Sequence, residues 1–116
     1  MPSPARLAAF VAMVEAGDYV RAIEDFYAEH ATGQENLGRT TVGRAALIAK
    51  EEAALARGAI ATARGSIALT GGDHVAIRWV FEMSGGRKLD EIAWQRWEGE
   101  HIVEERFYYD PAQMAG

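Results

Sequence analysis

The sequence predicts an α+β fold in which a curved antiparallel sheet carries three helices on its concave side. Apolar residues recur at helical spacing in the first half of the chain, and strand-like alternation runs from Ile60 to Tyr109. Glycine-rich turns separate the alternating segments, and the connections are too short for crossover helices. A short segment between the two halves places the acid Glu35 at the edge of whatever pocket the sheet and helices leave.

Two helices are expected first, joined at Gly17-Asp18. Ser3 can cap the first helix and Pro4 suits its first position, while Asp18 is expected to cap the second. The apolar stripe of the first helix is Leu7, Phe10, Val11 and Val14, and that of the second is Tyr19, Ile23, Phe26, Tyr27 and His30. The second stripe predicts a helix that ends at His30, where an imidazolium would complement the helix dipole.

A third helix is expected from Gly43 to Arg57, after a short extended stretch from Ala31 to Val42. Its buried edge is predicted to be Leu47, Ile48, Glu51 and Leu55. The four strands that follow are expected at Ile60 to Leu69, His74 to Met83, Leu89 to Trp97 and Ile102 to Tyr109. Their order along the chain predicts an antiparallel meander.

Composition limits the class of function. With 17 acidic and 12 basic side chains the net charge of the 116 residues is −5, which argues against nucleic acid or an anionic membrane as partner. The chain has no cysteine, so thiolate chemistry and disulfides are excluded. We expect a single domain over residues 1–116, with no targeting or membrane-spanning segment, in the cytoplasm.

Four motifs together resemble the nuclear-transport-factor-2-like superfamily, particularly its ketosteroid-isomerase and SnoaL-like branches. They are the helix pair broken at Gly17-Asp18, the segment FYAEHATGQENLG, the helix start at Gly43-Arg44 and the ending WEGEHIVEERFYYDP. The resemblance spans nearly the whole chain. It implies a cone-shaped barrel: a strongly bent antiparallel sheet, three helices on its concave side and a deep pocket between them. It also implies dimerisation through the convex sheet face.

The resemblance places Glu35 where ketosteroid isomerases have their catalytic base. A carboxylate in an apolar cone has a raised pKa, which suits proton transfer. The alternative is a strand-edge carboxylate that faces water or pairs with Arg39 or Arg44. Asn36 stands where that family often has proline, which is expected to alter the local backbone.

Two positions depart from the isomerase pattern. Phe10 and Ala93 occupy the places of the tyrosine and the acid that hold the developing oxyanion in ketosteroid isomerases. Neither side chain can donate a hydrogen bond. Ketosteroid isomerisation as such is therefore not expected.

If Trp97 faces the cone, as the family's aromatic residue does, strand alternation places Gln95, Ala93 and Glu91 on the same inner face. The same parity turns Glu105, Phe107 and Tyr109 inward on the last strand. The predicted ligand-binding residues are Phe10, Tyr27, Trp79, Phe81, Gln95, Trp97, Glu105, Phe107 and Tyr109. In the alternative interpretation, Trp79 and Trp97 fill the cone and its acids lie at a solvent-exposed mouth. For Glu105 this alternative is favoured, because Arg106 is adjacent in sequence and Arg96 lies on the neighbouring strand.

No cofactor and no metal site are expected, because His30, His74 and His101 lack ligand spacing. A His30–Glu35 dyad stays open as a minor alternative. On the opposite sheet face Ile92, Trp94 and Tyr108 predict a homodimer interface.

Three functions remain open: cofactor-free acid–base catalysis by Glu35 as isomerase, cyclase or dehydratase on a small apolar or aromatic molecule, non-catalytic ligand binding, and a structural dimerisation module.

Overall fold

The computed structural model describes residues 1–114, except for the side chains of residues 66–68. Its helices are α1 (Pro4–Glu15), α2 (Tyr19–Phe26) and α3 (Arg44–Arg57), with two short 3-10 turns at Ser84–Gly86 and Pro111–Met114. One sheet, in the order β2-β1-β6-β5-β4-β3, contains β1 (Tyr27–Glu35), β2 (Thr41–Val42), β3 (Ile60–Gly71), β4 (His74–Met83), β5 (Arg87–Glu98) and β6 (His101–Tyr108).

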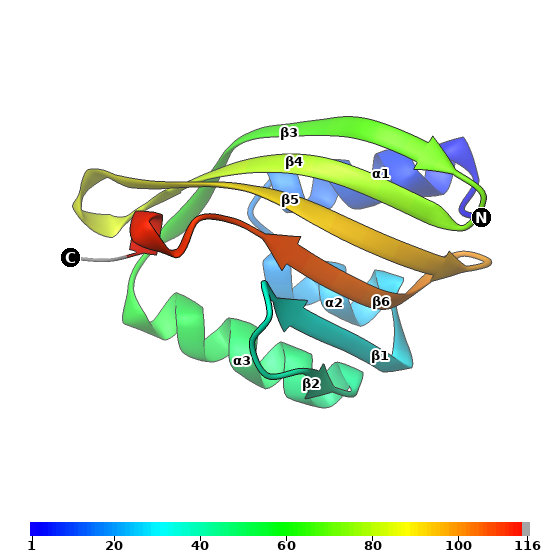
Figure 1. Ribbon diagram of the computed structural model, residues 1–116, viewed down its shortest axis with the longest axis horizontal. Helices are drawn as coiled ribbons and strands as arrows, with labels where there is room; N and C mark the ends of the chain where they lie inside the picture. Colours follow the sequence, from blue (N-terminus) through cyan, green and yellow to red (C-terminus); the bar gives the residue numbers. More distant parts are fainter. Residues whose placement is uncertain (115–116) are drawn as a thin grey trace.

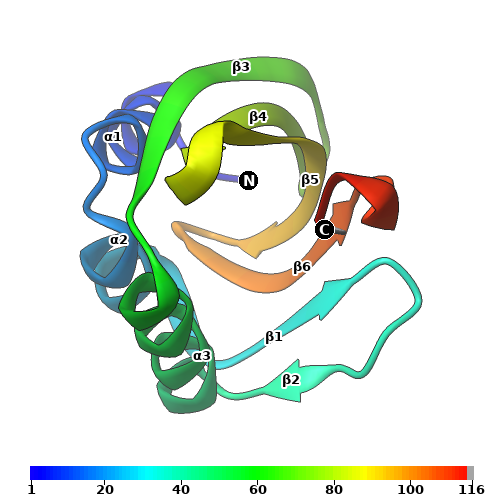
Figure 2. The ribbon, with the colours of Figure 1, turned by 90° about the vertical axis from the view of Figure 1, so that its left-hand side faces the viewer.

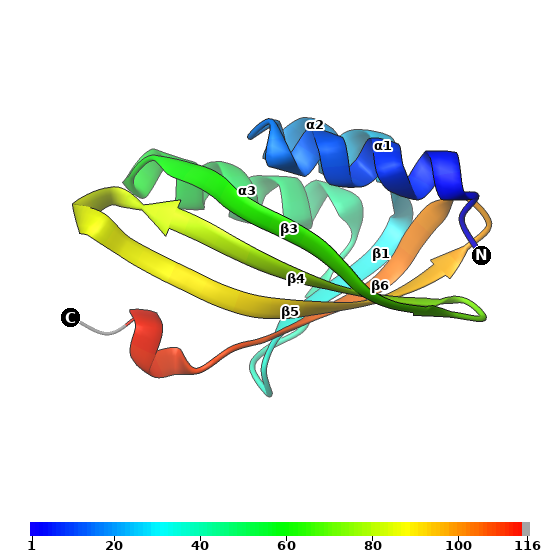
Figure 3. The ribbon, with the colours of Figure 1, turned by 90° about the horizontal axis from the view of Figure 1, so that it is seen from above.

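The sheet is strongly bent, and the three helices lie along its concave side (Figures 1 and 3). Seen along the sheet, the strands from β3 to β6 curve around an interior that the helices close on one side (Figure 2). The predicted cone-shaped α+β architecture is thus confirmed. The barrel does not close, because β3 and β2 are the two edge strands of the sheet and do not pair with each other.

One strand pair differs from the antiparallel sheet that was predicted. The four strands from β3 to β6 form the expected antiparallel meander, but β1 pairs with β6 in parallel. β1 is contributed by the segment after α2, and it reaches β6 from across the fold rather than through a hairpin. The sheet is therefore mixed.

The second helix ends at Phe26, four residues before the predicted end at His30. From Tyr27 the backbone is extended and pairs with β6, beginning at Ile102. Tyr27 is buried in this strand as it would have been in the helix, so its spacing from Ile23 and Phe26 fitted a helical stripe. His30 is exposed on β1, and the expected contact with a helix dipole is absent there.

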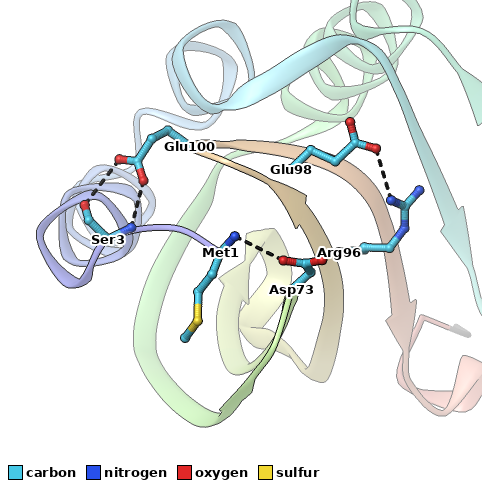
Figure 4. A network of polar contacts seen from close by, with 6 residues as sticks. All are labelled: Met1, Ser3, Asp73, Arg96, Glu98 and Glu100. Atoms are coloured by element: carbon cyan, nitrogen blue, oxygen red, sulfur yellow. Dashed lines mark hydrogen bonds and ion pairs between the residues drawn. The ribbon is translucent and has the colours of Figure 1, made fainter.

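The start of the chain is tied to two hairpin turns (Figure 4). The Ser3 hydroxyl accepts a hydrogen bond from the Arg6 amide at 3.1 Å, which confirms the predicted cap. The Ser3 amide also donates to Glu100 at 2.8 Å, and the Met1 amino group lies 3.1 Å from Asp73. Asp18 stands at the N-cap of α2, but its side chain makes no capping hydrogen bond, so that prediction was wrong.

Aromatic side chains fill the interior between α1 and the sheet. The ring of Phe10 meets Phe26 edge-on at a centroid distance of 5.3 Å, and it contacts Trp97 at 5.9 Å and Trp79 at 6.4 Å. Trp79 and Trp97 are both almost completely buried. Such edge-to-face contacts add specific orientation to the gain from burial.

Gly65 on β3 gives a direct test of this packing. A methyl group at Gly65 would overlap the ring of Trp79, its partner on β4. We expect Gly65→Ala to lower the free energy of unfolding by about 1–3 kcal/mol, the usual cost of overpacking a core. Gly71→Ala in the same strand meets open space and should be close to neutral. Urea unfolding of both variants measures the difference, and equal stabilities would contradict the packing described.

Candidate functional site

The inner face of β5 carries the residues that strand alternation predicted. Glu91, Ala93, Gln95 and Trp97 are all buried, while the intervening side chains face outward. β4 presents Ile77 and Trp79 to the same interior. The assumption that Trp97 faces the cone, together with strand alternation, therefore placed the inner face of β5 correctly.

A chain of hydrogen bonds runs through this interior. The indole N–H of Trp97 donates to Gln95 at 3.0 Å, and the Gln95 amide donates to Glu105 at 2.6 Å. The hydroxyl of Tyr27 donates to the other Glu105 oxygen. All four side chains are buried, so the bonds satisfy groups that water cannot reach.

Glu105 lies inside the cone, and the interpretation that placed it at a wet mouth beside Arg96 and Arg106 was wrong. The residue is only 4% exposed. Burial raises its pKa to about 7, although the hydrogen bonds from Tyr27 and Gln95 act in the opposite direction. Arg96 and Arg106 alternate with the inner residues and lie on the outer face of the sheet.

Glu91 is the second buried acid, placed on the inner face by the pattern but not assigned to the site. It is 6% exposed, and among the described residues none donates a hydrogen bond to its carboxyl group. Burial raises its pKa to about 8, and the charges of Glu105, Glu35 and Glu51 add to the increase.

Glu35 lies at the rim of the interior, at the end of β1. One carboxylate oxygen is 2.8 Å from the Lys50 ammonium of α3, and the other accepts a hydrogen bond from the Tyr109 hydroxyl at 3.2 Å. Its side chain is 45% exposed. The cation beside it is neither Arg39 nor Arg44; Arg44 instead donates to the Tyr27 carbonyl at 3.2 Å.

Asn36 holds the turn that follows Glu35. Its φ is +50°, a value that the proline ring cannot adopt, which explains how the chain departs from the isomerase pattern here. The Asn36 amide donates to the Phe107 carbonyl at 2.7 Å, and its side chain accepts from the Tyr109 amide at 2.9 Å. Both bonds fix Glu35 and Tyr109 side by side.

An open cleft of about 780 Å³ adjoins Glu35. Its walls are Glu35, residues 38–42, Ala46 and Lys50, so it lies between α3 and the connection from β1 to β2. The Glu35–Lys50 ion pair borders this cleft, and Tyr109 meets Glu35 from the other strand edge. A small molecule in the cleft can therefore reach the Glu35 carboxylate.

The predicted ligand-binding residues divide into two groups. Six are buried and packed against or bonded to one another: Phe10, Tyr27, Trp79, Gln95, Trp97 and Glu105. Phe81, Phe107 and Tyr109 are half-buried toward the mouth. Lys50, Glu51 and Glu91 complete the charged surroundings of Glu35, and the pattern gave none of them a site role, since only the folded chain brings them together.

Metal binding has no counterpart in the part of the chain that the structure describes, where no group of three histidine or acidic side chains is arranged to hold an ion. His30 makes no contact that would pair it with Glu35 in a dyad, because the Glu35 partners are Lys50 and Tyr109. Of the described helices, none has the length and apolar character needed to cross a membrane.

Comparison with solved structures identifies the fold. A candidate polyketide cyclase from Pseudomonas putida superposes with a TM-score of 0.78 at 18% identity, over 98% of this chain and 96% of the other. A candidate SnoaL-like polyketide cyclase from Mesorhizobium loti gives 0.68 at 23% identity, over 90% and 96%. A ketosteroid-isomerase-like protein from Catenulispora acidiphila, in complex with trimethylamine, gives 0.67 at 21% identity, over 93% and 87%.

No family model and no curated protein sequence matches the chain. The structural neighbours confirm the nuclear-transport-factor-2-like fold that the sequence motifs predicted.

The two buried acids predict a characteristic dependence of stability on pH. Their folded pKa values of about 8 and 7 lie above the ordinary 4.5, so the folded state holds protons that the unfolded state has lost. Stability should be greatest below about pH 4.5, should fall as the pH rises from there to the folded pKa values of about 7 and 8, by at most about 1.4 kcal/mol per pH unit and group, and should level off above them.

Urea unfolding across this range measures the slope. Glu91→Gln should flatten it and exceed the wild type in stability at about pH 9, because the variant has no acid to ionise at this place. Glu104→Gln on the exposed face is the control and should keep the slope. Equal slopes in the wild type and the Glu91 variant would contradict the assignment.

Proposed function

We propose that this chain is a small-molecule pocket domain of the SnoaL-like type that catalyses cofactor-free proton transfer, with Glu35 as the general base. The observation that carries the proposal is the position of Glu35. Its carboxylate borders an open cleft and is held between an ammonium group and a phenol. A base must be both oriented and within reach of its substrate, and this arrangement supplies both conditions.

The same partners supply hydrogen-bond donors that the isomerase positions lack. Phe10 and Ala93 are core residues without donors, so charge that develops on a substrate has no stabilising group there. The Lys50 ammonium and the Tyr109 hydroxyl lie beside Glu35 instead. The proposal therefore excludes ketosteroid isomerisation and assigns isomerisation, cyclisation or dehydration of a different substrate.

The proposed substrate class follows from the walls of the cleft beside Glu35. They combine the apolar side chains of Val42 and Ala46 with polar side chains that include Thr40, Thr41 and Lys50. A small apolar or aromatic body with a carbonyl or hydroxyl group suits such a mixture.

Non-catalytic ligand binding is the second candidate. The neighbour with a ketosteroid-isomerase-like fold from Catenulispora acidiphila is in complex with trimethylamine, so a protein of this fold can hold a small molecule. This function would use the same cleft and would not need Glu35 as a base.

Proton abstraction can be measured without knowledge of the natural substrate. In D₂O, we expect the protein to accelerate α-proton exchange of 2-indanone, a small aromatic ketone, as followed by proton NMR. Glu35→Gln should reduce the protein-dependent rate by about 10²-fold or more, the usual contribution of a general base. Glu104→Gln, an equal change of charge on the outer face, should not alter it. Exchange that survives in the Glu35 variant would leave ligand binding as the better function.

We further propose a homodimer through the convex face of the sheet. Ile92, Trp94 and Tyr108 are exposed there, and Trp94 is 37% accessible while its ring stacks on His74 at 5.1 Å. An Arg78–Asp90 ion pair lies on the same face, so apolar and charged groups alternate as at many two-fold interfaces.

Light scattering tests the dimer. At about 50 μM the wild type should have the mass of two chains if its Kd is near 1 μM. Trp94→Glu should yield monomers, because it places a charge at the centre of the apolar patch. Glu29→Gln on β1, an exposed residue away from the patch, serves as control. A wild type that remains monomeric at this concentration would refute the interface.

A further inference from the structure

We propose that the mouth of the cone binds the ammonium group of a small aromatic or apolar amine, with Glu91 as its anchor. The inference rests on the proposed small-molecule site and names the chemical class of its ligand.

Four carboxyl groups from four different elements lie in the interior and at its rim, where Glu35 is 45% exposed. Glu35 comes from β1, Glu51 from α3, Glu91 from β5 and Glu105 from β6. They lie near enough for their charges to interact, since Glu35, Glu51 and Glu105 all raise the pKa of Glu91. The Lys50 ammonium reaches the rim, where it is already paired with Glu35. When they are ionised, these carboxyl groups repel an anion and attract a cation.

Glu91 is the member of this group that lacks a partner. Every fully occluded side-chain nitrogen or oxygen among the described residues has a hydrogen-bond partner. Because no described residue donates to Glu91, its carboxyl oxygens must still contact solvent-accessible space. Glu91 is thus 94% buried and its carboxyl group has no donor among the described residues, so a donor from a ligand would satisfy it.

The neighbours of Glu91 on the sheet are aromatic. Trp79 lies directly opposite on β4, and Tyr109 follows the β6 residue paired with Ile92, which places it beside Glu91 on the other side. Phe81 stacks on Trp79 at 5.9 Å. Aromatic faces attract cations, while the rings also offer surface to an apolar body. Acid and aromatic groups together distinguish an organic ammonium ion from a metal ion.

Binding of an ammonium ion is coupled to a proton. In the free protein Glu91 is protonated below its pKa of about 8. A cation favours the ionised carboxylate, so binding lowers this pKa and releases a proton. The affinity should therefore rise with pH until Glu91 is ionised without ligand.

Other titratable and charged groups also lie near Glu91. They are Glu35 and Tyr27 on β1, Lys50 and Glu51 on α3, and Glu105 and Tyr109 on or after β6. Glu105 also titrates, with a pKa of about 7, but Tyr27 and Gln95 already occupy both of its oxygens. A substitution at Glu91 therefore separates the two acids.

Isothermal titration calorimetry of benzylammonium against benzyl alcohol tests the proposal. The two probes have nearly the same shape and differ in charge. We expect benzylammonium to bind about tenfold more tightly or better than benzyl alcohol at about pH 8, and its affinity to fall by up to about fiftyfold between pH 8 and pH 6, as a coupled proton with a pKa of about 8 requires. Equal affinities of the two probes, or no change of benzylammonium affinity with pH, would overturn the proposal.

Variants locate the anchor. Glu91→Gln keeps the shape of the side chain and should abolish both the preference for benzylammonium and its pH dependence. Glu104→Gln on the outer face should preserve both. A Glu91 variant that retains the preference would also overturn the assignment, and its folding can be checked by urea unfolding.

The outcome is separable from that of the proposed catalysis. Heat of binding does not depend on turnover, so benzylammonium selectivity without 2-indanone exchange would reject only the role of Glu35 as a base. Exchange without benzylammonium selectivity would reject the amine site and leave the catalytic proposal intact.

Discussion

The hydrogen-bond chain from Trp97 through Gln95 to Glu105 and Tyr27 is the constraint on which the rest of the structure depends. It joins β5 and β6 to the point where α2 changes into β1. Polar groups this deeply buried are tolerated only when all of them are hydrogen-bonded. This network of hydrogen bonds therefore favours one strand register and one end of the helix. Tyr27 must leave the helix for its hydroxyl to reach Glu105. The parallel pairing of β1 with β6 begins at this same residue.

The same hydrogen-bond network also separates a closed end of the cone from an open one. On its closed side Phe10 and the tryptophans leave no polar group without a partner. Toward the mouth the side chains become half-exposed, and the acids Glu91 and Glu35 lie beyond the satisfied network. Reactive or ligand-binding groups are expected among the polar side chains whose hydrogen bonds do not already stabilise the fold. The interior thus changes along its length from a structural core to a candidate site.

Much of the fold could be predicted because strand alternation records burial directly. β4 begins and ends where the pattern places it, and the inner face of β5 follows from the orientation of one residue, Trp97. The end of α2 could not be predicted, since Tyr27 suits a helical stripe and a strand equally well and only Glu105, 78 residues away, decides between them. The same limit hid the Lys50 partner of Glu35, which lies on another element. Contacts between distant residues leave no periodic signal.

The charge distribution explains why polar function would move to the mouth in this chain. Ketosteroid isomerases stabilise developing charge deep in the cone, but here Phe10 and Ala93 make that depth apolar, and the acid that remains there, Glu105, is committed to Tyr27 and Gln95. An anionic intermediate at that depth would find the donors of Tyr27 and Gln95 already committed to Glu105, while Glu91 and Glu35 lie nearer the mouth. A substrate that carries its own positive charge reverses this disadvantage, because each acid then attracts it. In the proposed complex Glu35 abstracts a proton at the rim while the ammonium group lies against Glu91, so both carboxylates are ionised, one as the base and the other as the counter-ion of the substrate.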